Sequence, residues 1–274
     1  MQKFADSVQS QVAYVNDEWR DKEDIPNIYS RESRQKNTSQ REVIIYNARS
    51  AHERGLLDLD HEGFALVNHH SKFSDFDTKD LVLSTYFPEM RELLLEITGA
   101  EEALPFPFYQ VRSNDPEHFF DAYSLYMHCD YSPSSCIPFA QSIIKRDGST
   151  PPFPAQDWDF SFYNLWRPVD IPVERDPLFW MDASTVQPAD IIDYRPVKEA
   201  DQGVAAVPLF NQDQKLNYLP GMQTDEVLIL KQLDSRAGKS QVCPHTSFVD
   251  PTAPADARAR QSIDVRFLCI FPKG

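Results

Sequence analysis

Short apolar runs separated by polar, proline-containing loops dominate the second half of the chain. Such runs, with apolar residues either alternating or continuous, are typical of strands that face a buried core. Roughly ten strands at near-regular spacing favour a β-sandwich or a β-barrel. The predicted strands cover residues 43–46, 63–67, 106–111, 123–131, 160–166, 178–182, 204–210, 216–219, 227–233 and 262–271.

One region of the first half has the period of a helix instead. Met90, Leu93, Leu94 and Ile97 recur at intervals of three and four residues, which places them on one face of a helix. A proline in the first turn and a glycine directly after the last one bound this segment at 88–99, as is common at helix ends. We therefore predict an amphipathic helix that packs on the outside of a sheet.

The remaining helical signals are weaker. Asp77 and Thr78 predict the start of a helical segment that runs to about Tyr86, while residues 134–146 fit either a loop or a short helix. Because the clear helices fall in the N-terminal half, we predict a mainly β (α+β) fold. Its expected architecture is a jelly roll with the N-terminal helices packed on one face.

The first 40 residues differ in character from the rest. Residues 1–40 are polar and charged and predict an N-terminal arm on the surface, whereas 41–274 show no shift in composition and predict a single domain. The chain has 21 Pro and only 8 Gly, a balance that argues against long helices and fits short strands joined by irregular loops.

Charge and cysteine usage exclude several classes of partner. The net charge of −15, from 42 acidic and 27 basic residues, argues against binding to nucleic acid or to anionic membranes. No apolar run of about 18 residues predicts a membrane span, and residues 1–6 lack the apolar core of a signal peptide. The four cysteines have no CxxC spacing. We therefore expect a cytoplasmic protein, either a monomer or a homodimer, that acts on a small molecule.

The candidate chemistry begins at His128 and Asp130, two positions apart in a predicted strand. Side chains two apart in a strand share a face, so an imidazole and a carboxylate would point the same way. A 2-His-1-carboxylate iron site needs one further histidine. His245 is the only histidine downstream and is the default third ligand.

A second pair follows that histidine. Arg260 and Ser262 are also two apart and can hold a carboxylate through charge-assisted hydrogen bonds. The ordered set of His-x-Asp, a distant His and Arg-x-Ser indicates such a site more specifically than any one of its members does. The competing interpretation is structural: His128 is a core histidine, and Asp264 and Arg266 form ion pairs along a strand. Other arginines that compete for the carboxylate are Arg112, Arg167, Arg258 and Arg266.

Longer stretches carry a family resemblance from about residue 41 to the end. The matching stretches are LDLDHEGFALV, YFPEMRELLLEITGA, YMHCDYS, YNLWRPVDIPVERDPLFWMDASTV, YLPGMQTDEVLILKQLDS and HTSFVDPTAPADARARQSIDVRFL. Within them NLWRP, DEVLILKQLDS and HTSFVDP are far more specific than His-x-Asp alone. The chain thus resembles fungal and bacterial non-haem iron oxygenases of the CmcJ/NvfI, gibberellin-desaturase-like group, which act in secondary metabolism.

The resemblance implies a double-stranded β-helix that binds Fe(II) and 2-oxoglutarate. It implies that His128, Asp130 and His245 are the iron ligands, and that Arg260 and Ser262 anchor the distal carboxylate of 2-oxoglutarate. The other residues expected around the co-substrate are Arg167 and Tyr126. Those expected around the substrate are Arg112, Asn164, Trp166 and Phe248.

The reaction expected from this resemblance consumes O₂ and 2-oxoglutarate and releases succinate and CO₂. Its outcome would be hydroxylation, desaturation or oxidative cyclisation of a small secondary metabolite or an amino-acid-derived substrate. Two alternatives remain open at this point. One is a non-haem iron oxidase that uses O₂ without 2-oxoglutarate, and the other is a non-catalytic jelly-roll binding protein.

Overall fold

Two β-sheets form most of the computed structural model, which describes residues 5–106, 108–113, 123–148, 158–197 and 203–273. The first sheet has five strands, and all its neighbours are antiparallel except β10 and β2. Its order is β1 (Ser7–Val15), β2 (Thr38–Asn47), β10 (Leu216–Tyr218), β7 (Leu178–Met181) and β12 (His245–Ser247).

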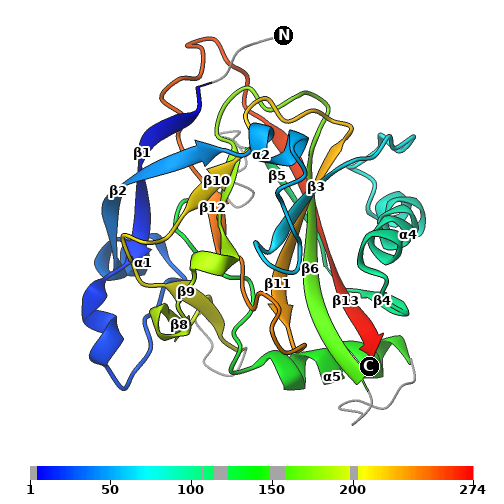
Figure 1. Ribbon diagram of the computed structural model, residues 1–274, viewed down its shortest axis with the longest axis horizontal. Coiled ribbons are helices and arrows are strands. Elements are labelled where there is room, and N and C mark those ends of the chain that lie inside the picture. Colours follow the sequence, from blue (N-terminus) through cyan, green and yellow to red (C-terminus); the bar gives the residue numbers. More distant parts are fainter. Residues whose placement is uncertain (1–4, 107, 114–122, 149–157, 198–202, 274) are drawn as a thin grey trace.

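The second sheet has six strands and is antiparallel throughout. Strand β5 (Gln110–Ser113) pairs with β13 beside its main path. That path runs through β3 (Phe64–Asn68), β11 (Glu226–Asp234), β6 (Trp158–Val169), β13 (Gln261–Pro272) and β4 (Glu102–Pro105). A small sheet of β8 (Ile191–Tyr194) and β9 (Ala205–Pro208) lies below the first sheet in Figure 1.

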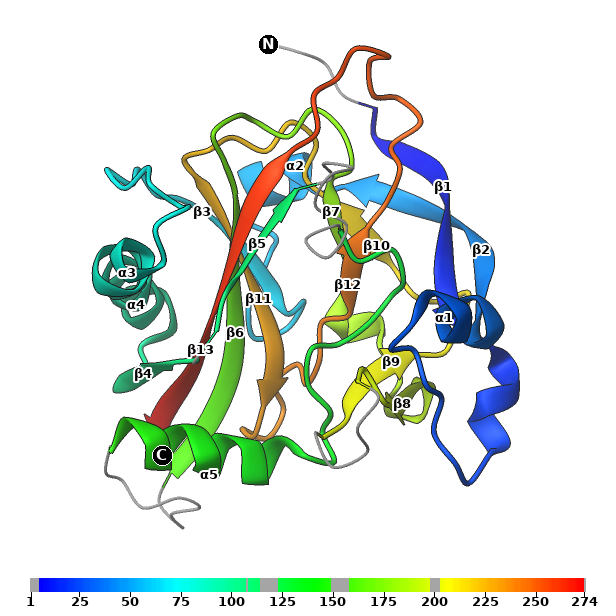
Figure 2. The same cartoon turned by 180° about the vertical axis from the view of Figure 1, so that it is seen from behind.

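Helix α4 (Phe87–Thr98) covers the outer face of the six-stranded sheet (Figures 1 and 2). Its buried Met90 and Leu94 join a cluster with Leu165 of β6 and Val265 of β13. Gly99 ends the helix at φ 66°, a left-handed conformation that costs glycine little. The predicted amphipathic helix is therefore confirmed, with a five-residue π-helical turn, Val82–Tyr86, directly before it.

The other helices are short or lie at the edges of the sheets. The ambiguous stretch near residue 140 is a helix, α5 (Cys136–Asp147), whose apolar face packs on the end of the six-stranded sheet. The short ones are α1 (Arg31–Asn37), α2 (Arg49–Glu53) and α3 (Lys79–Leu81). Single 3-10 turns lie at Asp17–Asp21, Ala183–Thr185 and Pro188–Asp190. No helix of the described residues is long and apolar enough to cross a membrane.

The side-chain alternation of β13 separates the core from a polar interior. Ile263, Val265 and Phe267 face α4, as the period of two predicts, whereas Asp264 and Arg266 face the five-stranded sheet. A second apolar cluster fills the space between the sheets, with Trp180 of β7 packed near Leu228 and Leu230 of β11. The mainly β fold is thereby confirmed.

Two predictions about elements were wrong. The stretch 123–131 is not a regular strand, because Tyr126, His128 and Cys129 each form an isolated bridge to a different element and no ladder repeats. Residues 7–15, expected in a surface arm with only some local structure near Val8–Val15, form β1 and pair with β2 along their whole length. Tyr14 is fully buried there. The predicted boundary at residue 40 therefore falls inside β2.

Candidate metal centre

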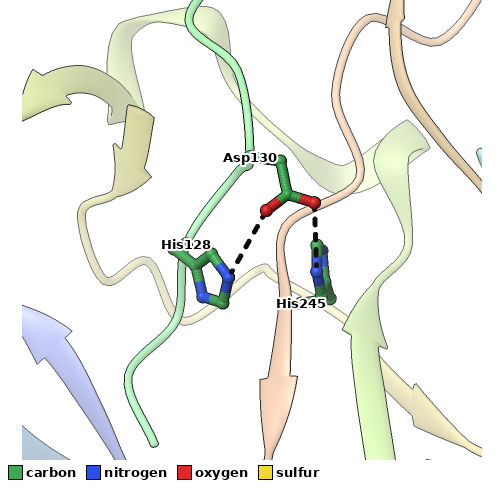
Figure 3. Close-up of side chains that lie close together, drawn as sticks. All are labelled: His128, Asp130 and His245. Atoms are coloured by element: carbon green, nitrogen blue, oxygen red, sulfur yellow. Dashed lines mark ion pairs between the residues drawn. The ribbon is translucent and has the colours of Figure 1, made fainter. Parts of the chain in front are cut away.

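His128, Asp130 and His245 converge between the two sheets, as Figure 3 shows. His128 and His245 are paired through their backbones, with N–H to carbonyl distances of 3.3 and 2.9 Å. Nε2 of His128 lies 3.9 Å from Oδ1 of Asp130, and Nε2 of His245 lies 3.7 Å from Oδ2. One ligand atom from each residue lies within 4.8 Å of the others, a spacing that one metal ion can bridge.

Backbone carbonyls orient both imidazole rings. Nδ1 of His128 donates to the carbonyl of Tyr126 at 2.9 Å, and Nδ1 of His245 lies 3.3 Å from the carbonyl of Cys243. A carbonyl only accepts hydrogen bonds, so each Nδ1 carries the proton and each Nε2 presents a lone pair. A histidine that binds a metal through one ring nitrogen usually donates a hydrogen bond from the other nitrogen.

The charge state of the three side chains also suits a cation. Burial, reinforced by the neighbouring His245, lowers the pKa of His128 to about 3, so this ring is neutral at neutral pH. Burial alone would raise the pKa of the Asp130 carboxyl, but Arg266 and the two imidazoles hold it well below its usual range. Two imidazoles and one carboxylate are the donor set of non-haem Fe(II) centres.

Asp130 is held by side chains from the six-stranded sheet. Arg266 donates from Nη2 to Oδ1 at 3.1 Å, and Asn164 donates from Nδ2 to Oδ2. The guanidinium of Arg266 is itself fixed by Asp264, with 2.9 Å between Nε and Oδ2. The structural interpretation expected ion pairs on β13, and Asp264 and Arg266 do form one. The Nη2 atom of Arg266 also binds Asp130.

Gln232 on β11 connects the segment of His128 to that of His245, and it is not among the site residues predicted from the sequence. Its Oε1 accepts from the backbone N–H of Asp130 at 3.3 Å, and its Nε2 donates to the carbonyl of Cys243 at 3.1 Å. The side chain is completely buried. Gln232 follows Leu228 and Leu230 at intervals of two residues, and this polar side chain at the end of an apolar row was the signal available in the sequence.

We expect Gln232→Leu to lower the free energy of unfolding by about 1–3 kcal/mol, because it leaves the Asp130 N–H without this partner and removes one of two donors from the buried carbonyl of Cys243. Urea denaturation of the metal-free protein measures this loss. Gln241→Leu is the matched control, since Gln241 is exposed and bonds only to the nearby carbonyl of Lys239. Equal loss in both variants would contradict the assigned role of Gln232.

A cavity beside the three residues contains Arg260. Its guanidinium is buried and donates from Nε to the Asp176 carbonyl and from Nη2 to Ser247 Oγ, both at 2.6 Å, and from Nη1 to Ser262. All these acceptors, the partners that the described residues provide, are neutral oxygens. Burial lowers the pKa of Arg260 to about 10, which leaves it charged at neutral pH. The nearby Asp176 carboxylate favours the charged form of Arg260, but no carboxylate of the described residues is hydrogen-bonded to the guanidinium. A buried cation that no carboxylate binds directly is costly, so the cavity favours an anionic ligand.

The cavity also contains some of the residues predicted to contact the substrate. Arg112, Asn164 and Trp166 line it together with His128, His245 and Arg260. The indole of Trp166 lies under the Arg260 guanidinium, 5.0 Å from the ring centre to Cζ, and Tyr123 lies at 3.9 Å. Arg258, the alternative carboxylate-binding arginine that is nearest to Arg260 in sequence, is instead exposed and pairs with Glu174 at 2.6 Å.

Three residues predicted to contact the co-substrate or the substrate lie outside the cavity lining. Arg167 follows Trp166 on β6 and so faces the opposite side of the sheet, where it donates to the carbonyl of Thr224. Phe248 is buried among Phe179 and Tyr218.

Tyr126 is the third of these residues. It packs its ring 5.2 Å from that of His128, and its hydroxyl lies 3.1 Å from the hydroxyl of Tyr194. None of these three lines the cavity, and their contacts with co-substrate or substrate stay predictions.

Comparison with known proteins places these features in a family. Residues 8–270 match the family model described as oxidoreductase/YMDC permease-like domain. The chain is 28% identical over 240 residues to the Fe(II)/2-oxoglutarate-dependent dioxygenase nvfI of Aspergillus novofumigatus, covering 85% of this chain and 84% of that relative. It is 27% identical to the hydroxylase/desaturase efuI of Hormonema carpetanum, covering 84% and 83%.

A solved structure agrees with the sequence matches. The iron and alpha-ketoglutarate-dependent endoperoxidase NvfI superposes with a TM-score of 0.85 at 26% identity, over 99% of this chain and 100% of that one. The protein belongs to this oxidoreductase family, together with the fungal Fe(II)/2-oxoglutarate-dependent dioxygenases that its sequence resembles.

Proposed function

We propose that this protein is an Fe(II)/2-oxoglutarate-dependent oxygenase that hydroxylates, desaturates or oxidatively cyclises a small secondary metabolite. The relatives are named as dioxygenases, a hydroxylase/desaturase and an endoperoxidase, which supports an oxidative reaction of this range. We further propose that the two sheets together form the double-stranded β-helix of such enzymes, and that β1 belongs to the same unit.

One observation carries the proposal. His128, Asp130 and His245 converge on one point, and the buried cation Arg260 lies in the same cavity with only neutral hydrogen-bond acceptors among the described residues. The first feature fits a ferrous ion, and the second fits the distal carboxylate of a 2-oxo acid. A structural ion-pair network would explain why His128, Asp130 and His245 converge. It would not explain why the buried Arg260 has only neutral hydrogen-bond acceptors among the described residues.

Each of these residues has a definite part in the proposed reaction. His128 and His245 would hold the iron through Nε2 and Asp130 through a carboxylate oxygen, all from one side, which leaves the other side open to exogenous ligands. The bound iron and 2-oxoglutarate would supply O₂ activation coupled to decarboxylation of the 2-oxo acid to succinate and CO₂. Arg260 and Ser262 would orient the co-substrate by binding its distal carboxylate.

The rest of the cavity wall would select and place the substrate. Trp166 offers an apolar face beside the metal ligands, and Arg112 offers a cation on the same wall. These side chains would position one C–H bond of the substrate and exclude water from it. We also propose that the protein does not bind nucleic acid, given its net charge of −15. The cytoplasmic location and the monomeric or homodimeric state stay predictions.

The proposal is tested by adding Fe(II) and 2-oxoglutarate to the purified protein without O₂. We expect the weak visible charge-transfer band of a chelated 2-oxo acid, followed by succinate formation when air is admitted. Iron binding without the band and without succinate would instead indicate an oxidase that does not use 2-oxoglutarate. A protein that binds no iron would overturn both enzyme functions and leave a jelly-roll binding protein.

A further inference from the structure

Two strands of the six-stranded sheet place a pair of donors directly on Asp130. Asn164 of β6 and Arg266 of β13 are register partners, so they lie side by side across the sheet. Arg266 binds Oδ1 of the carboxylate, and Asn164 binds Oδ2. We call this pair the carboxylate clamp. Each oxygen of Asp130 therefore has one donor from the sheet, in addition to facing one imidazole.

Arg266 is fixed by several acceptors, whereas Asn164 is held by burial and by its bond to Asp130, since its Oδ1 has no partner among the described residues. Arg266 is 6% exposed, and its guanidinium is held by Oδ2 of Asp264 at 2.8 and 2.9 Å and by Oε1 of Gln110 at 3.3 Å. Asn164 is 1% exposed. Its amide must turn Nδ2 toward Asp130, because the reverse orientation would bring two acceptors together. The clamp is thus a rigid surface against which Asp130 rests.

From this arrangement we infer that Asn164 and Arg266 are positioning residues that fix the carboxylate of Asp130 for metal binding, rather than substrate contacts. The inference rests on the proposed function. A carboxylate that turns freely can bind a metal through both oxygens and so occupy two coordination positions. A donor on each oxygen opposes that rotation and keeps the carboxylate facing the two Nε2 atoms.

Charge determines how the clamp can be tested. Arg266 lies between two buried carboxylates, Asp130 and Asp264, so its removal alone would leave two like charges in the interior. Such a variant would be destabilised for reasons unrelated to the metal. The double variant Asp264→Asn/Arg266→Met removes one charge of each sign and avoids that difficulty, while it still takes the donor away from Asp130.

The test measures the Kd for Co(II), an air-stable substitute for Fe(II), with the full chain. We expect Asn164→Ala and Asp264→Asn/Arg266→Met each to weaken Kd by about 10-fold to 100-fold, the usual effect of losing an outer-shell partner. Arg266→Lys keeps the positive charge but lacks the planar guanidinium with its several donors. Its Kd for Co(II) should therefore lie between those of the two clamp variants and that of the unaltered protein.

Ser161→Ala is the matched control for Asn164→Ala. Ser161 is a fully buried polar residue on the same strand, and it donates to the carbonyl of Leu233 at 2.5 Å, away from Asp130. We expect this variant to lose some stability and to keep its Kd. Urea denaturation of the metal-free variants separates a loss of stability from a loss of metal affinity.

Two results would overturn the inference. If the unaltered protein binds Co(II) and both clamp variants match the Kd of Ser161→Ala, the clamp has no positioning role while the proposed function stands. If the unaltered protein binds no metal, the proposed function and the clamp fall together. A loss of affinity confined to the clamp variants, with metal-free stability similar to that of the control, supports it.

Discussion

His245→Ala should abolish retention of iron by the purified protein and with it the formation of succinate. His245 supplies one of only two imidazoles at the centre, and the cavity beside it offers no nearby histidine other than His128 among the described residues. Loss of a direct ligand should weaken the Kd for Fe(II) by more than about 100-fold, the upper end of the effect of outer-shell partners. Iron per chain after anaerobic loading and desalting measures this change.

His69→Ala is the control for this variant. His69 is also partly buried, but it lies 3.6 Å from Glu89 of α4, on the outer side of the six-stranded sheet. It should retain iron like the unaltered protein. The substitution at position 245 truncates a side chain on a cavity wall, so the metal-free protein should still fold. Equal iron retention in the two variants would show that the ligand set is wrong.

Arg260→Met should weaken the binding of 2-oxoglutarate while iron is retained. Truncating one partner of a buried, hydrogen-bonded charge pair costs about 2–5 kcal/mol. The lower end of that range already corresponds to a loss of affinity of about 30-fold, since each 1.4 kcal/mol is tenfold. Titration of the iron-loaded protein with 2-oxoglutarate, followed through its visible band, gives the Kd directly.

The stability of the Arg260→Met variant is measured separately from its affinity for 2-oxoglutarate. Arg260→Met removes a buried cation but also takes this donor from the Asp176 carbonyl, Ser247 and Ser262, so urea denaturation of the metal-free variant accompanies the Kd measurement. Arg258→Met, two residues earlier and exposed, is the control and should leave Kd unchanged. If Arg260→Met binds 2-oxoglutarate within about threefold of the unaltered protein, Arg112 becomes the candidate anchor.

Periodicity predicted several features of this fold correctly. The alternation along β13 assigned Ile263, Val265 and Phe267 to one face and Asp264 and Arg266 to the other, because a strand allows no other arrangement. The same rule, applied to β6, would have excluded Arg167 from the cavity, since Trp166 and Arg167 are adjacent and must face opposite sides. For α4, the proline and glycine at its ends marked the boundaries because both act locally.

Partners distant in sequence explain most of the wrong predictions. Strand β1 reads as a polar segment, and it becomes part of a sheet only because β2 pairs with it. The segment around His128 has apolar residues typical of a strand, but its bridges go to β1, β12 and β9 in turn. No local pattern encodes such a change of partner. Phe248 follows His245 closely, yet it packs into the core near Phe179.

The sequence alone therefore determined the kind of chemistry available: a His-x-Asp pair, one later histidine, and an Arg-x-Ser pair on the last long strand. Residue type and local period carry that information, because ligand identity and strand faces depend on near neighbours. Only the tertiary structure decided that Arg260 rather than Arg258 enters the cavity. It also showed that Asn164, Arg266 and Gln232 hold the ligand segments in place, since these contacts join strands far apart along the chain.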